Sequence, residues 1–543
     1  MIDDATTLLQ DDKTIRLPDQ KTARLLLWLA LFLGWCTDWL FHGKQLGVSW
    51  PLFILLILGG LWQIGRSESV RPVYRNLWLV VPLLFFAAMA MVRANGFLTV
   101  MNVLASLAIL SYLAYFYAAG RVGSLSMAGA LSLPARVGAH SLVLAGPVLV
   151  DRMDMTQLGK RGRRNLFPLL RGALLALPVL FVFTLLLASA DLIFADYVEA
   201  VFDLDFIDDI FEWLWRGFVI LLAAWVLAGG FLYALRQNGR ADDSSFFESG
   251  LAKLAQTLPI GFIETTTVLV LVNVLFAAFT AVQFTYLFGG RTYAALENFT
   301  YANYARNGFF ELVAVAVLSL SLSLSLNWIT RRESKRQIRF FNGLSSLMIG
   351  FVFVMLVSAF QRMRLYEAAF GYTELRLIVY TFMIWLGLLL GWFLLTLWAA
   401  PHRFAIGFIL TAMGFLVTLN LINPDAFIAG QNLDRYLRTN DLDAAYLTGL
   451  SDDAAPQLVR ALNLVHDDAQ LVSVPACTGY WNESEWISDY KDCQATPYEI
   501  LRDELNGRFQ TMTDNPDWQR WQSFHFSRQI AYTALFRLFV GES

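Results

Sequence analysis

The chain has 543 residues, of which 57% are hydrophobic, 15% aromatic and only 16% charged, and its formal net charge is −3. Soluble proteins carry about 25% charged residues and disordered chains are poor in aromatic ones, so the composition excludes both classes. A net charge near zero offers no basic surface for nucleic acid, and we expect no nucleic-acid partner. The composition predicts an integral membrane protein whose surroundings are the lipid bilayer.

Apolar runs long enough to cross a bilayer recur along most of the chain. A helix needs about 20 mostly apolar residues to cross a hydrocarbon core of about 30 Å. Such runs predict eleven spans, at about 25–41, 48–65, 77–92, 97–119, 166–190, 214–235, 261–288, 308–328, 341–360, 374–399 and 404–423. The strands of a membrane barrel are about ten residues long and alternate in polarity. The sequence therefore predicts an all-α polytopic protein with about 11 transmembrane helices.

Lysine and arginine concentrate in alternate connections between these runs, which sets the expected orientation. Residues 1–24 and the connections after the second, fourth, sixth and eighth spans are basic, whereas the other connections hold few positive charges. Because cytoplasmic loops carry the excess of lysine and arginine, we expect 1–24 to be a cytoplasmic tail. We also expect 25–423 to be the transmembrane domain, with 120–165 as a basic cytoplasmic segment, and 424–543 to lie outside.

Several polar residues fall inside the predicted spans, where each one is costly. Asp38 lies toward the outer end of the first span. Thr266, Asn273 and Thr280 are spaced seven apart on one stripe of the seventh span, with Gln283 one turn further out. Polar stripes either join helices through hydrogen bonds or line a path for a solute, and both interpretations stay open.

A short repeat opens two of the outward-starting spans. Gly308–Leu312 and Gly371–Leu375 both read glycine, aromatic, any residue, glutamate, leucine. Arginines lie just before them, at Arg306 and at Arg362 and Arg364. An acid in a first turn is ordinary chemistry for the positive end of a helix. The alternative is that Glu311, Glu374 and the arginines converge on one outward-facing polar site for an anion, a proton or acid–base chemistry.

The last 120 residues are expected to form a small, mainly helical extracytoplasmic domain. Residues 424–543 carry 9 basic and 18 acidic residues, a charge of −9, so the remainder of the chain carries +6. Cys477 and Cys493 can close a disulfide in an oxidising exterior. No metal-ligand cluster or phosphate-binding loop is evident, so we expect no metal and no cofactor. The domain is also where an envelope protein partner would bind.

Four stretches of the sequence resemble a known family. They are Glu264–Thr266, Asn273–Phe276, Tyr286–Gly290 and Tyr301–Leu312. They resemble the bacterial multi-pass family called domain of unknown function 4173, with similarity over about 160–450. The resemblance implies a multi-pass protein of the bacterial inner (plasma) membrane, and it implies no activity.

Three functions remain open from the sequence. The first is transport of a small solute or ion through a polar, outward-facing helix bundle. The second is an enzyme that processes envelope lipids or glycans at the outer leaflet, with the outward carboxylates around one groove. The third is a membrane sensor or scaffold that uses residues 424–543.

Overall fold

The computed structural model describes residues 20–118, 120–152, 205–235, 261–288, 309–330, 332, 334–400, 403–466, 470–474, 480–482, 485–487 and 493–541. Within them, ten helices are long and apolar enough to cross a membrane. These ten correspond to ten of the eleven predicted spans, and the remaining one, 166–190, lies outside the described residues. The prediction of an all-α polytopic membrane protein is confirmed.

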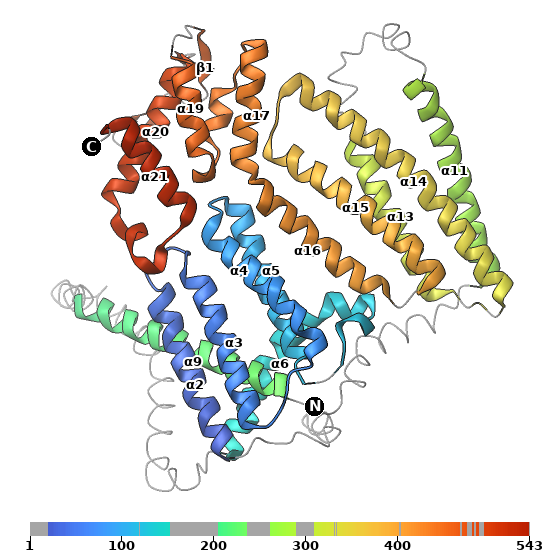
Figure 1. The fold of residues 1–543 in the computed structure, drawn as a ribbon, viewed down its shortest axis with the longest axis horizontal. Coiled ribbons are helices and arrows are strands. Elements are labelled where there is room, and N and C mark those ends of the chain that lie inside the picture. Colours follow the sequence, from blue (N-terminus) through green and yellow to red (C-terminus); the bar gives the residue numbers. More distant parts are fainter. Residues whose placement is uncertain are drawn as a thin grey trace, which may run out of the picture.

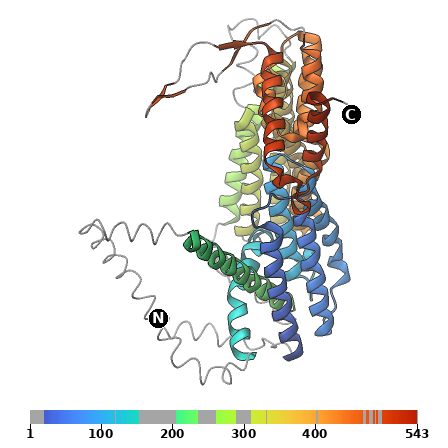
Figure 2. The same ribbon diagram turned by 90° about the vertical axis from the view of Figure 1, so that its left-hand side faces the viewer.

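The first bundle is built from the N-terminal helices (Figure 1). It contains α2 (Gln20–Phe41), α3 (Ser49–Ser67), η1 (Tyr74–Leu79), α4 (Val80–Val92), α5 (Gly96–Tyr115), η2 (Val122–Ser124), α6 (Met127–Arg152) and α9 (Asp205–Leu235). Their buried apolar residues form one continuous core. Figure 2 shows α9 running obliquely across the blue and cyan helices. A Cβ at Gly229 of α9 would lie 1.8 Å from the Ser141 carbonyl oxygen of α6, so this close crossing requires glycine.

Helix α6 lies in the stretch 120–165, where the charge pattern predicts only a basic connection. Ala130, Leu133 and Val137 are buried in the core of the first bundle, at helical spacing. The tyrosine hydroxyl of Tyr112 donates a 2.6 Å hydrogen bond to the Ala130 carbonyl. This part of the segment is therefore packed structure.

The second bundle contains α11 (Phe262–Phe288), α13 (Phe309–Ile329), α14 (Lys335–Phe370) and α15 (Glu374–Ala399). These four helices share a separate apolar core. A capping box between Ser334 and Gln337 starts α14 before its apolar stretch. Helix α16 (Phe404–Ile422) packs on both bundles, because Phe404 belongs to the second core while Ala405 and Ile409 belong to the first.

The remaining elements form a unit of their own at the end of α16, which we call the C-terminal unit (residues 424–541) (Figure 1). It contains α17 (Pro424–Thr439), α18 (Ala444–Thr448), η4 (Asp452–Ala454), α19 (Ala455–Leu464), β1 (Val472–Val474), β2 (Tyr480–Asn482), β3 (Glu485–Ile487), β4 (Cys493–Ala495), α20 (Pro497–Asp514), η5 (Pro516–Gln519), η6 (Trp521–Ser523) and α21 (Phe526–Phe539). The strands form two short antiparallel pairs, β1 with β4 and β2 with β3. The helices enclose a third apolar core. Cys477 lies outside the described residues, so its pairing with Cys493 stays a prediction.

Candidate functional site

The two glutamates of the repeat lie in different surroundings. Glu311 and Glu374 are each in the first turn of their helix, α13 and α15, as the pattern predicts. Glu311 is exposed, whereas Glu374 is half-buried and accepts a 2.9 Å hydrogen bond from the Asn95 amide. Arg306 and Gly308 lie outside the described residues, so the expected convergence on one site stays a prediction.

Asp38 forms an ion pair between two helices of the first bundle. Both of its carboxylate oxygens bind Arg216 of α9, at 2.7 Å from Nη2 and 3.1 Å from Nε. Bidentate pairs of this kind fix orientation as well as charge. Asp38 therefore joins α2 to α9.

The polar stripe of the seventh predicted span faces α14. Asn273 Nδ2 donates to the carbonyls of Leu269, at 2.7 Å, and Leu344, at 3.1 Å. The Gln283 amide oxygen accepts from Ser358, at 2.8 Å, and from Arg362, at 3.3 Å. These contacts favour the helix-joining interpretation of the stripe. Arg364, two residues after Arg362 near the C-terminal end of α14, is exposed.

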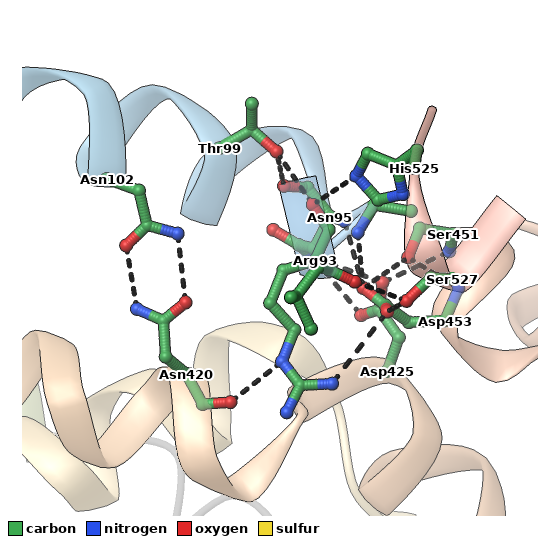
Figure 3. Close-up of polar contacts among 12 residues, drawn as sticks. Arg93, Asn95, Thr99, Asn102, Asn420, Asp425, Ser451, Asp453, His525 and Ser527 are labelled. Carbon is green, nitrogen blue, oxygen red and sulfur yellow. Dashed lines mark hydrogen bonds and ion pairs between the residues drawn. The ribbon is translucent and has the colours of Figure 1, made fainter. Parts of the chain in front are cut away.

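Among the residues that the structure describes, buried polar groups concentrate where the two bundles and the C-terminal unit meet (Figure 3). We call it the junction cluster, defined as Arg93, Asn95, Glu374, Asp425, Ser451, Asp453, His525 and Ser527. Asn95 belongs to the turn between α4 and α5, Glu374 to the second bundle, and the last five to the C-terminal unit. Three separately packed parts of the chain therefore share one polar network.

Asn95 is the residue that touches all three parts. Its amide nitrogen donates to Glu374 at 2.9 Å and to the two oxygens of Asp425 at 3.1 and 3.2 Å. Its amide oxygen accepts the Leu98 backbone N–H at 3.0 Å, which makes it the N-cap of α5. One side chain thus starts a membrane helix and joins the two bundles to the C-terminal unit.

Asp453 holds the same turn from the other side. Its Oδ2 accepts the backbone N–H groups of Ala94, at 2.8 Å, and Asn95, at 3.1 Å, and its Oδ1 accepts the Ser527 hydroxyl. Arg93 lies 4.0 Å away, and the Asp453 side chain is completely buried. Burial raises the pKa of Asp453 above its usual value, although the hydrogen bonds from Ser527 and Asn95 oppose this shift.

His525 is buried beside this carboxylate, with 3% of the residue exposed. Its Nε2 donates to the Arg93 carbonyl at 3.2 Å, and its Nδ1 has no hydrogen-bond partner among the residues that the structure describes. Burial, with help from the charge of Arg528, lowers the pKa of His525 to about 4. The imidazole is therefore neutral at physiological pH.

An amide pair extends the network into the membrane region. Asn102 of α5 and Asn420 of α16 exchange two hydrogen bonds, of 2.9 and 2.8 Å, and both residues are fully buried (Figure 3). Arg93 Nε donates to the Asn420 carbonyl at 2.7 Å, and burial lowers the pKa of this arginine. The pair therefore connects the junction cluster to the helix that packs on both bundles.

Backbone contacts also hold the C-terminal unit on each bundle. On the second bundle, the Asn432 side chain exchanges hydrogen bonds of 2.8 and 2.9 Å with the Tyr372 backbone. Gly371 beside it has φ +75°, and a Cβ there would lie 2.7 Å from the Asn432 oxygen, so only glycine fits. On the first bundle, Val48 donates to the Phe524 carbonyl at 2.9 Å.

The arrangement of the junction cluster suits mechanical coupling better than catalysis. Its carboxylates are occupied by donors from the protein itself. In the part of the chain that the structure describes, no group of three or more histidine, cysteine or acidic residues is placed to hold a metal ion. Of the cluster, only Glu374 stands out from the sequence. Asn95-Gly96 after an apolar run and Asn423-Pro424-Asp425 after another are helix-boundary signals, which place Asn95 and Asp425 at span ends but do not show that the two residues meet.

One family matches the chain. The family described as Domain of unknown function (DUF4153) matches residues 80–461. This finding corrects the family number suggested by the sequence resemblance, while both families are of unknown function. No curated protein matches the chain. No solved structure matches it either.

Proposed function

The chain belongs to the family Domain of unknown function (DUF4153), whose description names no activity, and we propose from the geometry that it is a membrane sensor or scaffold. In this proposal the C-terminal unit receives a signal or a partner and changes how the two helix bundles sit against each other. The observation that carries it is the three-way contact of Asn95 with Glu374 and Asp425.

The expected location completes the proposal. From the basic connections we infer a cytoplasmic N-terminus, and from the eleven spans that the sequence predicts, an odd number, we infer a C-terminal unit outside the bacterial inner membrane. The acidic charge of residues 424–543 supports this side, because it opposes the basic cytoplasmic loops. An envelope protein or an extracytoplasmic solute would then be the source of the signal.

Removing the hydrogen bond between Asn95 and Glu374 should loosen the contact between the two bundles. We expect Glu374→Ala to broaden and shift the distance distribution between spin labels on the two bundles, because Asn95 loses its partner in the second bundle. The labels are placed at the exposed positions Arg71→Cys and Arg336→Cys, in full-length protein whose own three cysteines are replaced. Pulsed electron paramagnetic resonance in lipid nanodiscs measures the distance.

The repeat itself supplies the matched control for this measurement. Glu311→Ala removes the corresponding glutamate from the first turn of α13, where it is exposed. It should leave the distance distribution unchanged. Identical distributions for Glu374→Ala, Glu311→Ala and the unsubstituted protein would contradict the coupling role.

A second candidate function, ion transport, is favoured by unbonded oxygens inside the second bundle. Asn273 Oδ1, Thr280 Oγ, Ser323 Oγ and Ser345 Oγ are buried and have no hydrogen-bond partner within the described ranges. Thr265 and Thr330 bond each other at 2.8 Å, so Asn273 and Ser323 both lie about 10–12 Å along their helices from this contact. Unbonded oxygens of Asn273 and Ser323 at a similar depth in α11 and α13 suit a cation or water.

Flux into proteoliposomes tests this alternative. If ions pass between the helices of the second bundle at these oxygens, Asn273→Leu should reduce sodium or proton uptake to the level of protein-free liposomes. The substitution replaces a buried oxygen ligand by an apolar group. Ser321→Ala, on the exposed side of α13, is the control. Uptake no greater than that of protein-free liposomes before any substitution would reject transport of these ions.

The third possibility, an outer-leaflet enzyme, gains no support from the described residues. Asp38 is paired with Arg216, and Glu374 is taken up by the junction cluster.

A further inference from the structure

A polar cavity lies between the C-terminal unit and the connection that joins α2 to α3. Its volume is about 460 Å³, within the range of small-molecule sites. The charged and polar lining includes Gln45 of the connection, together with Asp452, Glu504, Arg508 and Arg528 of the C-terminal unit, and Trp518 forms part of the wall. The cavity is separate from the junction cluster, although Asp452 is the sequence neighbour of Asp453.

The charges in this cavity are balanced but incompletely paired. Asp452 lies 3.8 Å from Arg508 Nη1 and 3.9 Å from Arg528 Nε, both beyond hydrogen-bond length. The Asp452 side chain is 23% exposed, and its carboxylate accepts no hydrogen bond from the described residues. Burial raises its pKa even though both arginines oppose the shift. A half-buried carboxylate without a hydrogen-bond donor has unused capacity for a cationic donor.

The neighbouring guanidinium group of Arg528 has unused donor capacity. Arg528 gives Nη1 to the Gln45 amide oxygen, and its Nη2 has no hydrogen-bond partner in the described part of the chain. Arg508 is instead largely occupied, by Glu504 at 2.7 Å and by the carbonyls of Thr448 and Leu450. Guanidinium groups pair preferentially with carboxylates and phosphates. Arg528 is therefore the anion-binding side of the cavity, and Asp452 is its cation-binding side.

We propose that this cavity binds a small zwitterion of the amino-acid or short-peptide class, with its ammonium group on Asp452 and its carboxylate on Arg528. Two arginines and two carboxylates leave the lining neutral, so a ligand with a net charge would leave one wall uncompensated. Because Gln45 belongs to the first bundle and bonds Arg528, a bound ligand rearranges the contact between that bundle and the C-terminal unit. This consequence rests on the proposed sensor function, whereas binding itself does not.

Calorimetric titration of full-length protein in lipid nanodiscs tests the site with three peptides. L-alanyl-L-alanine should bind, and its N-acetyl and C-terminal amide derivatives should each bind at least about tenfold more weakly, because each lacks one of the two charges. Equal binding of all three peptides, or no binding of the zwitterion at millimolar concentration, overturns the proposal.

Charge-specific variants place the ligand in the cavity. Asp452→Asn should weaken the zwitterion and the amide but not the N-acetyl peptide, whereas Arg528→Gln should weaken the zwitterion and the N-acetyl peptide but not the amide. These ratios do not depend on the fraction of folded protein. Arg520→Gln, on the exposed pair with Asp517 outside the cavity, should leave all three affinities unchanged. If both cavity variants keep the peptide selectivity of the unsubstituted protein, the ligand binds elsewhere and the assignment is overturned.

The two proposals fail in different ways. If the zwitterion binds but does not change the distance between labels at positions 71 and 336, the cavity stands and the coupling of ligand to the bundles is rejected. If no peptide binds while Glu374→Ala still separates the bundles, the cavity proposal is rejected and the junction remains.

Discussion

Asp453→Ala should lower the free energy of unfolding of the C-terminal unit by about 3–5 kcal/mol, which is the usual effect of removing one partner from a buried charged network. The substitution leaves the backbone N–H groups of Ala94 and Asn95 without their acceptor, and it removes one of the two acceptors of the Ser527 hydroxyl, the other being the Val92 carbonyl. Arg93, whose side chain is 16% exposed, also loses its counter-charge. Chemical denaturation in detergent micelles measures the loss.

Asp517→Ala is the matched control for this experiment. Asp517 also pairs with an arginine, Arg520 at 3.0 Å, but the two side chains are 44% and 54% exposed. Exposed pairs contribute about 0–1 kcal/mol. Equal effects of Asp453→Ala and Asp517→Ala would mean that the junction cluster does not hold the C-terminal unit.

Acidification from pH 6.5 to about 4 should cost the protein about 3 kcal/mol of stability through His525 alone. In this interval the unfolded chain gains a proton on this histidine while the folded protein does not, because burial holds the folded pKa at about 4. Stability from this group is therefore complete above pH 6.5 and is lost as the pH falls toward 4. His525→Gln removes the titrating group and keeps a donor for the Arg93 carbonyl.

Two neighbouring carboxylates act in the opposite direction, which fixes the design of this measurement. Burial raises the pKa of Asp452 and Asp453, so the folded protein takes up their protons before the unfolded chain does, and their contribution grows as the pH falls. Subtracting the stability profile of His525→Gln from that of the unsubstituted protein cancels the contributions of Asp452 and Asp453. If the two stability profiles stay parallel between pH 6.5 and 4, the imidazole is not held neutral by its surroundings.

The membrane helices could be predicted from the sequence because each needs only a local property, an apolar run of sufficient length. The starts of α13 and α15 and the capping box of Thr496 and Glu499 at α20 were predictable for the same reason. Helix α6 is not among the ten helices that are apolar enough to cross a membrane, so hydropathy misses it, and its packing against α9 and α5 gives it a place in the core.

The junction cluster could not be predicted, because its chemistry depends on which turns meet. Asn95 and Asp425 look like ordinary helix-boundary residues, and Asp453 looks like part of an acidic helix start. Conversely, Asp38 and Gln283 stand out in the sequence as costly polar residues in spans. Their partners, Arg216 and Arg362, account for this cost within the bundles.

The long sequence separation within the junction cluster has a consequence for biosynthesis. Asp453 follows Asn95 by 358 positions, and at about 5–20 residues per second its synthesis comes about 20–70 s after that of the turn. During this time the backbone donors of the turn between α4 and α5 have no permanent acceptor. The first bundle is therefore in the membrane before the C-terminal unit that completes this turn has been synthesised. A product truncated before Asp453 would leave the turn exposed to chaperones and proteases.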